Sequence, residues 1–154
     1  MSSEETRAAL VRFYETLSHG DGAGLGRLYT PDASFEDPVF SLRGADIGKM
    51  WTGLLGRARR FEVAYTVAQA GEKSGVVEWT ARYLFAGKRP VVNVILSELE
   101  LDNGLVARQR DTFDFRRWSA QALGLPGRLF GRMEWFRRSV SRKAALGLGV
   151  TPKP

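Results

Sequence analysis

Four runs of alternating apolar and polar residues, spread over residues 61–115, constrain the fold of this chain most strongly. Alternation with period two places every second side chain on the same face, which is the pattern of a strand with one buried face. Short turn sequences separate the runs: GEKSG, AGK and DNG, the last of which is a strong hairpin signal. Strands joined by such short turns pair antiparallel, so this half of the chain predicts a four-stranded meander.

The first half of the chain carries helical periodicity instead. Ser2 and Glu5 have the spacing of a capping box, and apolar residues then recur every three or four positions. A second, short helix is predicted over residues 22–29, and a third after Gly44. The apolar stripe of the first helix is Leu10, Phe13, Tyr14 and Leu17; that of the third is Ile47, Met50, Trp51, Leu54 and Leu55.

A short strand from Ala33 to Asp37, closed by Pro38, lies between the second and third helices. The resulting order, α-α-β-α-β-β-β-β, predicts an α+β fold in which three helices cover one face of a curved, mostly antiparallel sheet. This domain spans residues 1–115. Residues 116–154 predict a basic amphipathic helical tail, broken near Pro126, and we expect the final GLGVTPKP to be frayed.

Composition excludes several kinds of site. The chain has no cysteine, which excludes disulfides, thiolate catalysis and cysteine-bound zinc, and the one histidine, His19, lies at a helix end. We therefore predict neither a metal nor a cofactor. The polar N-terminus has no signal-peptide pattern and no run is long enough to span a membrane, so the expected location is cytoplasmic.

Alternation places several polar side chains on the face that is otherwise apolar. Burying such groups costs free energy unless they are hydrogen-bonded or serve a purpose. Polar groups that converge among aromatic residues are typical of a ligand pocket, and two carboxylates in one apolar site invite different pKa values. The five residues are Asp37, Asn93, Ser97, Gln109 and Asp111.

A structural interpretation of each residue stands beside this one. Asp37, directly before Pro38, has the position of a residue that caps a turn. Asp111 can instead form a strand-end ion pair with Arg108 or Arg110. The other three can be ordinary buried polar groups with backbone partners.

Four segments resemble the SnoaL-like and ketosteroid-isomerase-like proteins of the nuclear-transport-factor-2-like superfamily. They are RFYETLSHGD, ASFEDPVF, the helix start RGxxxI and the strand RQRDTFD, and the resemblance covers about residues 5–115. It implies a cone formed by a curved sheet and three helices around a deep cavity. It also implies a homodimer, since many relatives are dimers.

The resemblance assigns a role to particular residues. Asp37 takes the position of the general base of ketosteroid isomerases, and Asp111 matches the base of SnoaL-type cyclases. The positions of the two oxyanion donors fall on Phe13 and Ser97, so both isomerase donors are missing or weakened. Tyr14, one residue along from Phe13, is the phenolic donor nearest to the lost position.

The predicted function is a pocket that binds a small apolar molecule. If the chain is an enzyme, we expect a cofactor-free isomerase or cyclase in which an aspartate removes a proton next to a carbonyl group. The catalytic candidates are Asp37, Asp111 and Tyr14. The substrate-binding candidates are Phe13, Trp51, Tyr65, Trp79, Asn93, Ser97 and Gln109.

Two other functions stay open. The first is a non-catalytic module of the same fold that binds a ligand or forms a dimer. The second is water activation by Asp111, as in limonene-epoxide-hydrolase-like proteins. That chemistry requires a further Arg and Asp, whose positions read Trp79 and Ala81, while Glu78 and Arg82 have the opposite phase.

The positive charge of the chain is concentrated in its C-terminal third. Residues 108–154 hold 11 Lys/Arg against 3 Asp/Glu, interspersed with tryptophan and phenylalanine. Three interpretations fit this tail: a helical extension that packs on the domain or closes the cavity of a neighbouring subunit, a peripheral contact with an anionic membrane, or nucleic-acid binding. We do not expect nucleic acid, because the tail has no recognised binding motif.

Overall fold

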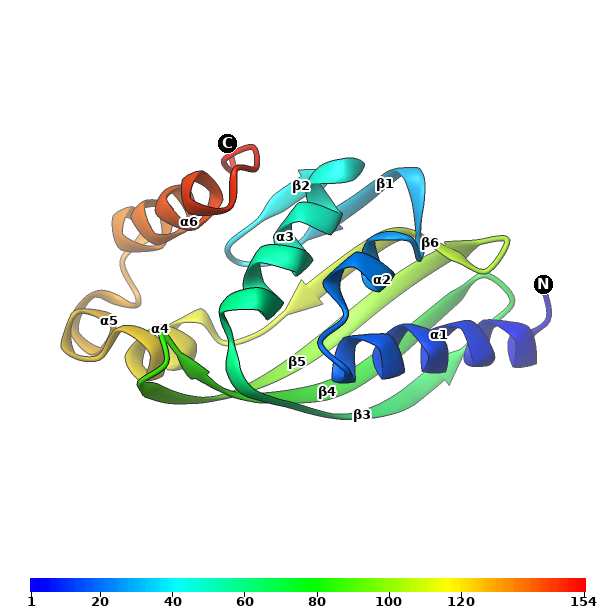
Figure 1. Ribbon diagram of the computed structural model, residues 1–154, viewed down its shortest axis with the longest axis horizontal. Helices are drawn as coiled ribbons and strands as arrows, with labels where there is room; N and C mark the ends of the chain where they lie inside the picture. Colours follow the sequence, from blue (N-terminus) through cyan, green and yellow to red (C-terminus); the bar gives the residue numbers. More distant parts are fainter.

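The computed structural model describes residues 1–154 and has the predicted α+β architecture (Figure 1). Six strands form one curved, open sheet in the order β2-β1-β6-β5-β4-β3. Only β1 and β6 pair in parallel, and all other neighbours are antiparallel. The strands are β1 (Tyr29–Glu36), β2 (Ser41–Arg43), β3 (Arg59–Ala70), β4 (Ser74–Phe85), β5 (Arg89–Asp102) and β6 (Leu105–Thr112).

Three N-terminal helices cover one face of this sheet (Figure 1). We call it the inner face. A cluster of 25 buried apolar residues fills the space between the helices and the strands. The helices are α1 (Ser3–Ser18), α2 (Gly22–Gly26) and α3 (Ala45–Arg57).

The start of α1 confirms the predicted capping box. The Ser2 hydroxyl accepts a hydrogen bond from the Glu5 N–H at 3.1 Å, and the Glu5 carboxylate accepts one from the Ser2 N–H at 3.2 Å. Two N–H groups that the helix leaves free are thereby satisfied. The side chains of Phe13 and Tyr14 on this helix are buried against the sheet.

The second helix is shorter than predicted, because Tyr29 belongs to β1 instead. Thr30 precedes a proline, which disfavours helical backbone and favours the extended conformation at that position. The glycines of α2 allow a close approach to α3. A Cβ atom on Gly22 would lie only 2.6 Å from the backbone of Thr52.

One strand and the end of another also differ from the prediction. β2 was not predicted, since three residues are too few to show a period. The last strand was expected to reach Phe115 but ends at Thr112, because Asp114 caps the next helix by accepting a hydrogen bond from the Arg117 N–H at 3.0 Å.

The tail is helical, as predicted, and continues from the end of the sheet (Figure 1). Its first helix is anchored on β4 and β5. Trp118 donates a hydrogen bond to the Tyr83 hydroxyl at 2.9 Å, and the Gln121 amide bonds both the N–H and the C=O of Val92. The helices are α4 (Phe115–Leu123), α5 (Leu125–Phe130) and α6 (Glu134–Leu148).

The end of the chain is bound to the turn between β1 and β2, so the prediction of a frayed C-terminus was wrong. Val150 is buried, and the N–H and hydroxyl of Thr151 both donate to Asp46 at 3.1 Å. Three consecutive carbonyl groups of the turn accept hydrogen bonds from side chains of this region. The donors are Lys153 to Asp37 (2.8 Å), Arg137 to Pro38 (3.0 Å) and Ser141 to Val39.

No helix of the protein is both long enough and apolar enough to cross a membrane.

Candidate functional site

Asp111 lies on the inner face of β6 with two hydrogen-bond donors around one of its oxygens. Ser97 on β5 is its partner across the sheet, and its hydroxyl donates to Asp111 Oδ1 at 2.6 Å. The amide of Gln109, two residues earlier on the same face of β6, donates to the same oxygen at 3.0 Å. All three residues are buried, as the alternation predicted.

Three further side chains extend these contacts into one buried network. Trp79 on β4 donates to the Ser97 hydroxyl at 2.8 Å. On the other side, the Tyr29 hydroxyl donates to the Gln109 carbonyl oxygen and accepts a hydrogen bond from Trp51 of α3 at 2.9 Å. The network therefore links β1, β4, β5, β6 and α3 through groups that are otherwise costly to bury.

Burial raises the pKa of Asp111 to about 7, and a negative charge on Asp37 acts in the same direction. The hydrogen bonds from Ser97 and Gln109 favour the ionised carboxylate and oppose this rise. At neutral pH, Asp111 consequently exists in both protonation states. A general acid or base that works near pH 7 needs this property.

The hydroxyl of Tyr14 is buried without a hydrogen-bond partner. Burial is the largest cause that raises the pKa of this phenol, and the charge of Asp111 acts in the same direction. The Ser97 hydroxyl lies near enough to lower that pKa, although it is already bonded to Asp111 and Trp79. The phenol stays protonated at neutral pH and is available as a donor. An unpartnered donor in a native interior is uncommon and needs an explanation.

Asp37 lies one residue beyond β1, and its carboxylate is occupied by the turn. Oδ1 accepts hydrogen bonds from the N–H groups of Val39 (2.7 Å) and Phe40 (2.6 Å). Burial raises the pKa of Asp37 to about 6, against these two hydrogen bonds and the nearby charge of Lys153. The geometry is that of a turn cap, and the role of general base stays a prediction.

The other predicted substrate-binding residues divide into two groups. Phe13 is buried beside the network, with its ring centroid 5.6 Å from that of Tyr29. Tyr65 and Asn93 are only half-buried, and the Tyr65 hydroxyl donates to Glu15 on α1 at 2.6 Å. These two residues therefore lie outside the network.

Tyr29 is the functional candidate that sequence reasoning missed. It was assigned to the end of a helix, although the following Thr30-Pro31 favours extended backbone. Its ring packs edge-on against Phe13, and its hydroxyl joins Trp51 to Gln109.

The further pair of residues required by epoxide hydrolases does not face Asp111. Glu78 and Arg82 are exposed, on the face of β4 opposite the buried Trp79 and Ala81. No three His, Cys, Asp or Glu side chains come together in a group that could hold a metal ion.

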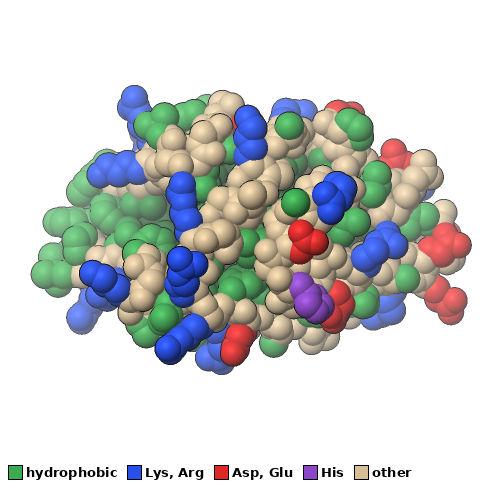
Figure 2. All heavy atoms as spheres, in the orientation of Figure 1, with side chains coloured by type: hydrophobic (Ala, Val, Ile, Leu, Met, Phe, Trp, Pro, Cys, Tyr) green, Lys and Arg blue, Asp and Glu red, His purple; other side chains and the backbone are tan.

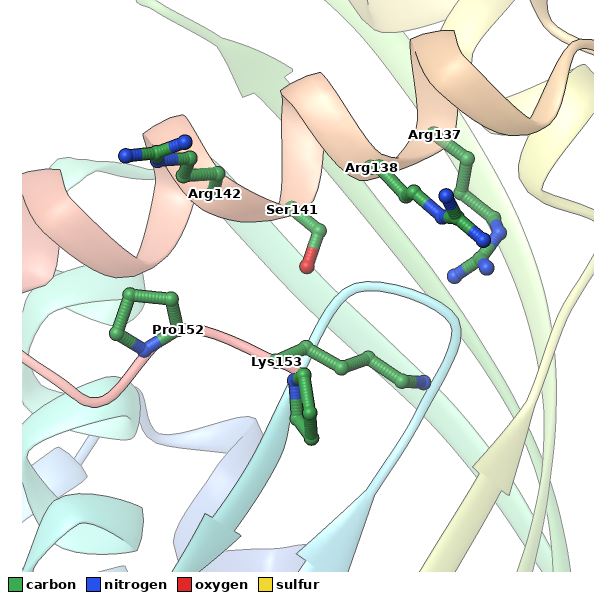
Figure 3. Close-up of a pocket in the computed structure, with 7 residues that line it drawn as sticks. Arg137, Arg138, Ser141, Arg142, Pro152 and Lys153 are labelled. Carbon is green, nitrogen blue, oxygen red and sulfur yellow. The ribbon is translucent and has the colours of Figure 1, made fainter.

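Two surface pockets lie away from the network. One is a basic cleft of about 350 Å³ between α6 and the C-terminal residues (Figure 3). The other is an open groove of about 610 Å³ along α4 and α5. Neither is lined by a predicted site residue, and the enclosed cavity implied by the resemblance stays a prediction. The cleft is lined by Arg137, Arg138, Ser141, Arg142, Pro152, Lys153 and Pro154.

Comparison with protein families gives one match over most of the domain: the model of the SnoaL-like domain family matches residues 10–109. Among curated proteins, a Steroid Delta-isomerase from Nocardioides simplex is 42% identical over 45 residues. That match covers 29% of this chain and only 33% of the isomerase.

Solved structures share the fold at low sequence identity. A hypothetical protein from Catenulispora acidiphila with a ketosteroid isomerase-like fold, crystallised in complex with trimethylamine, superposes with a TM-score of 0.68 at 16% identity. The match covers 78% of this chain and 95% of that chain. An LEH-like epoxide hydrolase from M. tuberculosis has a TM-score of 0.62 at 21% identity, covering 84% and 98%.

Proposed function

This chain belongs to the SnoaL-like domain family, and on that premise we propose that it binds a small apolar carbonyl compound and moves a proton on it through Asp111. The observation that carries the proposal is a buried carboxyl, Asp111, whose pKa is about 7 and whose charge acts on the unpartnered hydroxyl of Tyr14.

The two oxygens of Asp111 have different surroundings. Oδ1 accepts both hydrogen bonds, from Ser97 and Gln109, which fix the orientation of the carboxyl group. Oδ2 receives no hydrogen bond from the protein and is the oxygen that can take a proton. A base held in this way loses little entropy when it meets its substrate.

The proton transfer balances without a cofactor. Asp111 removes a proton from the carbon next to the carbonyl group, and the electrons of the broken C–H bond form the enolate. Tyr14 donates a hydrogen bond to the developing oxyanion, a contact that is worth most in a site without water. Return of the same proton from Asp111 to another carbon of the enolate completes an isomerisation.

The proposal is tested by proton exchange, which requires no knowledge of the natural substrate. A panel of β,γ-unsaturated cyclic ketones is incubated with the protein in D₂O, and loss of the α-proton is followed by NMR. Wild-type protein should catalyse the exchange. Asp111→Asn should slow it by roughly 10²–10⁴-fold, and Tyr14→Phe by roughly 10²-fold.

Asp37→Asn is the matched control, since it neutralises the half-buried carboxylate of the turn. If Asp37 serves the turn, this variant should exchange protons within a few-fold of wild type. The reverse result, an inactive Asp37→Asn and an active Asp111→Asn, would make Asp37 the base and overturn our assignment.

The second candidate function is a non-catalytic module. It is favoured by the hydrogen bonds that the buried polar groups of the network form with one another. Such a network can serve a purely structural role, which is to give the core one defined arrangement. In that case neither wild-type protein nor any variant raises the rate of proton exchange above that in solvent alone. Binding of the same ketones, measured by the shift in melting temperature, then separates a ligand-binding module from a purely structural one.

A further inference from the structure

The tail contains a cluster of exposed apolar side chains over residues 125–135, which we call the elbow. The elbow comprises α5, the turn after it and the first residues of α6. Eleven large apolar side chains are exposed in the whole protein, and five of them fall within these eleven residues. They are Leu125 (63% exposed), Leu129 (60%), Phe130 (39%), Met133 (48%) and Trp135 (58%).

The aromatic side chains of the elbow pack on one another, so the apolar surface is preformed. The ring centroid of Trp135 lies 5.3 Å from that of Phe130 and 5.9 Å from that of Phe136. In the space-filling view, hydrophobic atoms gather at the end of the molecule formed by the tail helices, with Lys and Arg side chains around them (Figure 2). A contiguous apolar patch on a soluble domain commonly marks an interaction surface.

The charge around the elbow is predominantly positive. Residues 116–143 contain eight Lys or Arg and a single acidic residue, Glu134, which is paired with Arg137 and Arg138. The groove along α4 and α5 combines both properties: Ala120, Leu125 and Leu129 line it together with three arginines and Asp114. The three arginines are Arg116, Arg117 and Arg128.

The combination of apolar and cationic side chains continues along α6 into the basic cleft. Trp135, Arg138 and Arg142 follow the spacing i, i+3, i+7 and therefore share one side of the helix. Both arginines line the cleft (Figure 3), and both are exposed. An apolar tip is thus followed at once by cationic groups that can bind phosphate oxygens.

We propose that the elbow docks on the surface of an anionic lipid bilayer. Leu129, Phe130 and Trp135 enter the boundary between headgroups and acyl chains, and the surrounding arginines bind lipid phosphates. Interfacial segments have this composition: leucine and aromatic residues on one side and arginine on the other. Nucleic acid would use the charge and leave the apolar side chains in water, and a second copy would bring two positive surfaces together.

The test measures the binding of the full chain to vesicles by sedimentation. Vesicles of phosphatidylcholine containing 30% phosphatidylserine should bind the protein in roughly 0.1 M salt, and vesicles of phosphatidylcholine alone should bind it at least tenfold more weakly. Trp135 is the only exposed tryptophan. Its fluorescence should therefore shift to shorter wavelength when the vesicles are added.

Two variants separate the two contributions. Leu129→Ser should weaken binding by about tenfold, because its apolar side chain no longer leaves water. Arg128→Gln with Arg132→Gln should weaken it by about 20-fold and reduce its dependence on salt. Leu146→Ser is the matched control: Leu146 is 63% exposed on α6 but lies outside the elbow, and its replacement should leave binding unchanged.

Several results would overturn the proposal. One is a wild-type protein that does not sediment with the anionic vesicles. Another is binding that salt abolishes while Leu129→Ser has no effect, which indicates attraction between charges only. A third is self-association or duplex DNA binding that Leu129→Ser weakens while vesicle binding persists, since the elbow would then serve that other partner.

Discussion

The inner face of the sheet carries polar side chains where apolar ones are expected, whereas the elbow carries apolar side chains where polar ones are expected. In the network, Ser97, Gln109 and Asp111 are buried and bonded to one another. In the elbow, Leu129 and Trp135 are more than half exposed, and no other part of the protein covers them.

The two regions differ in whether their side chains find partners within the chain. The side chains of the network bond to one another within the chain, and the one fully buried side-chain polar atom that lacks a partner is the hydroxyl oxygen of Tyr14. In the elbow, no part of the chain covers the exposed apolar side chains. Function is expected at positions where a buried polar group lacks a hydrogen bond or a large apolar side chain stays exposed. The two regions therefore point to two different ligands.

The largest effect expected from a single substitution is that of Asp111→Asn on the pH dependence of stability. Asp111 has a pKa of about 7 in the folded protein, against roughly 3.9 in an unfolded chain. Between these values the native state binds more protons, so wild-type stability falls as the pH rises from about 4 to 7. Asparagine cannot ionise, so the variant should not lose stability over this pH range.

At pH 8 we therefore expect Asp111→Asn to be more stable than wild type by up to about 4 kcal/mol, and at pH 4 no more stable. Urea denaturation at both pH values measures the difference. Two stability curves that run parallel over this range would mean that Asp111 titrates normally, and the contrast between the two regions would lose its basis.

Ser97→Ala should have the next largest effect. The substitution removes a hydrogen bond to Asp111 and leaves the Trp79 N–H buried without its acceptor. We expect a loss of about 2 kcal/mol at pH 8, and a higher pKa for Asp111, because the Ser97 hydrogen bond lowers that pKa. Ser74→Ala, at an exposed position of β4, should change stability by less than about 0.5 kcal/mol.

Ser141→Ala tests how firmly the tail is attached to the domain. Its hydroxyl donates to the carbonyl of Val39, and the loss of this buried hydrogen bond should cost about 1 kcal/mol. Ser139→Ala is the control two residues away, where no hydrogen bond is lost. Equal stabilities for the two variants would show that the carbonyl finds water when the hydroxyl is removed.

The smallest effect on stability belongs to the elbow. Leu129→Ser removes an apolar side chain that is already 60% exposed, so the free energy of unfolding should change by no more than about 0.5 kcal/mol. The same variant is expected to weaken vesicle binding. A destabilisation above about 1 kcal/mol would make Leu129 part of the folded core and weaken the inference of a docking surface.

Much of the site could be predicted because period-two alternation is a property of the strand itself. The buried position of Ser97 follows from its phase with Ile95 and Leu99 on the same strand. The buried positions of Gln109 and Asp111 follow from their phase with Phe113. Alternation says which face a side chain occupies, but it does not say which polar groups meet. The hydrogen bonds to Oδ1 of Asp111 depend on the register between β5 and β6, which sequence alone does not define.

The residues whose surroundings the sequence did not define lie near the ends of helices. Tyr29 follows a glycine-rich helix so short that tertiary packing decides where it ends. Leu129 and Met133 continue a regular helical stripe with Phe136 and Val140, yet only the latter two pack on the core. Periodicity identifies an apolar side of a helix and cannot tell whether anything covers it.

The three carbonyl groups of the Asp37–Val39 turn accept hydrogen bonds from residues 99 to 116 positions further along the chain. A ribosome adds roughly 5–20 residues per second, so these donors emerge on the order of ten seconds after the turn itself. During that interval the carbonyl groups must be satisfied by water, and the turn that contains Asp37 reaches its final form only when the tail arrives.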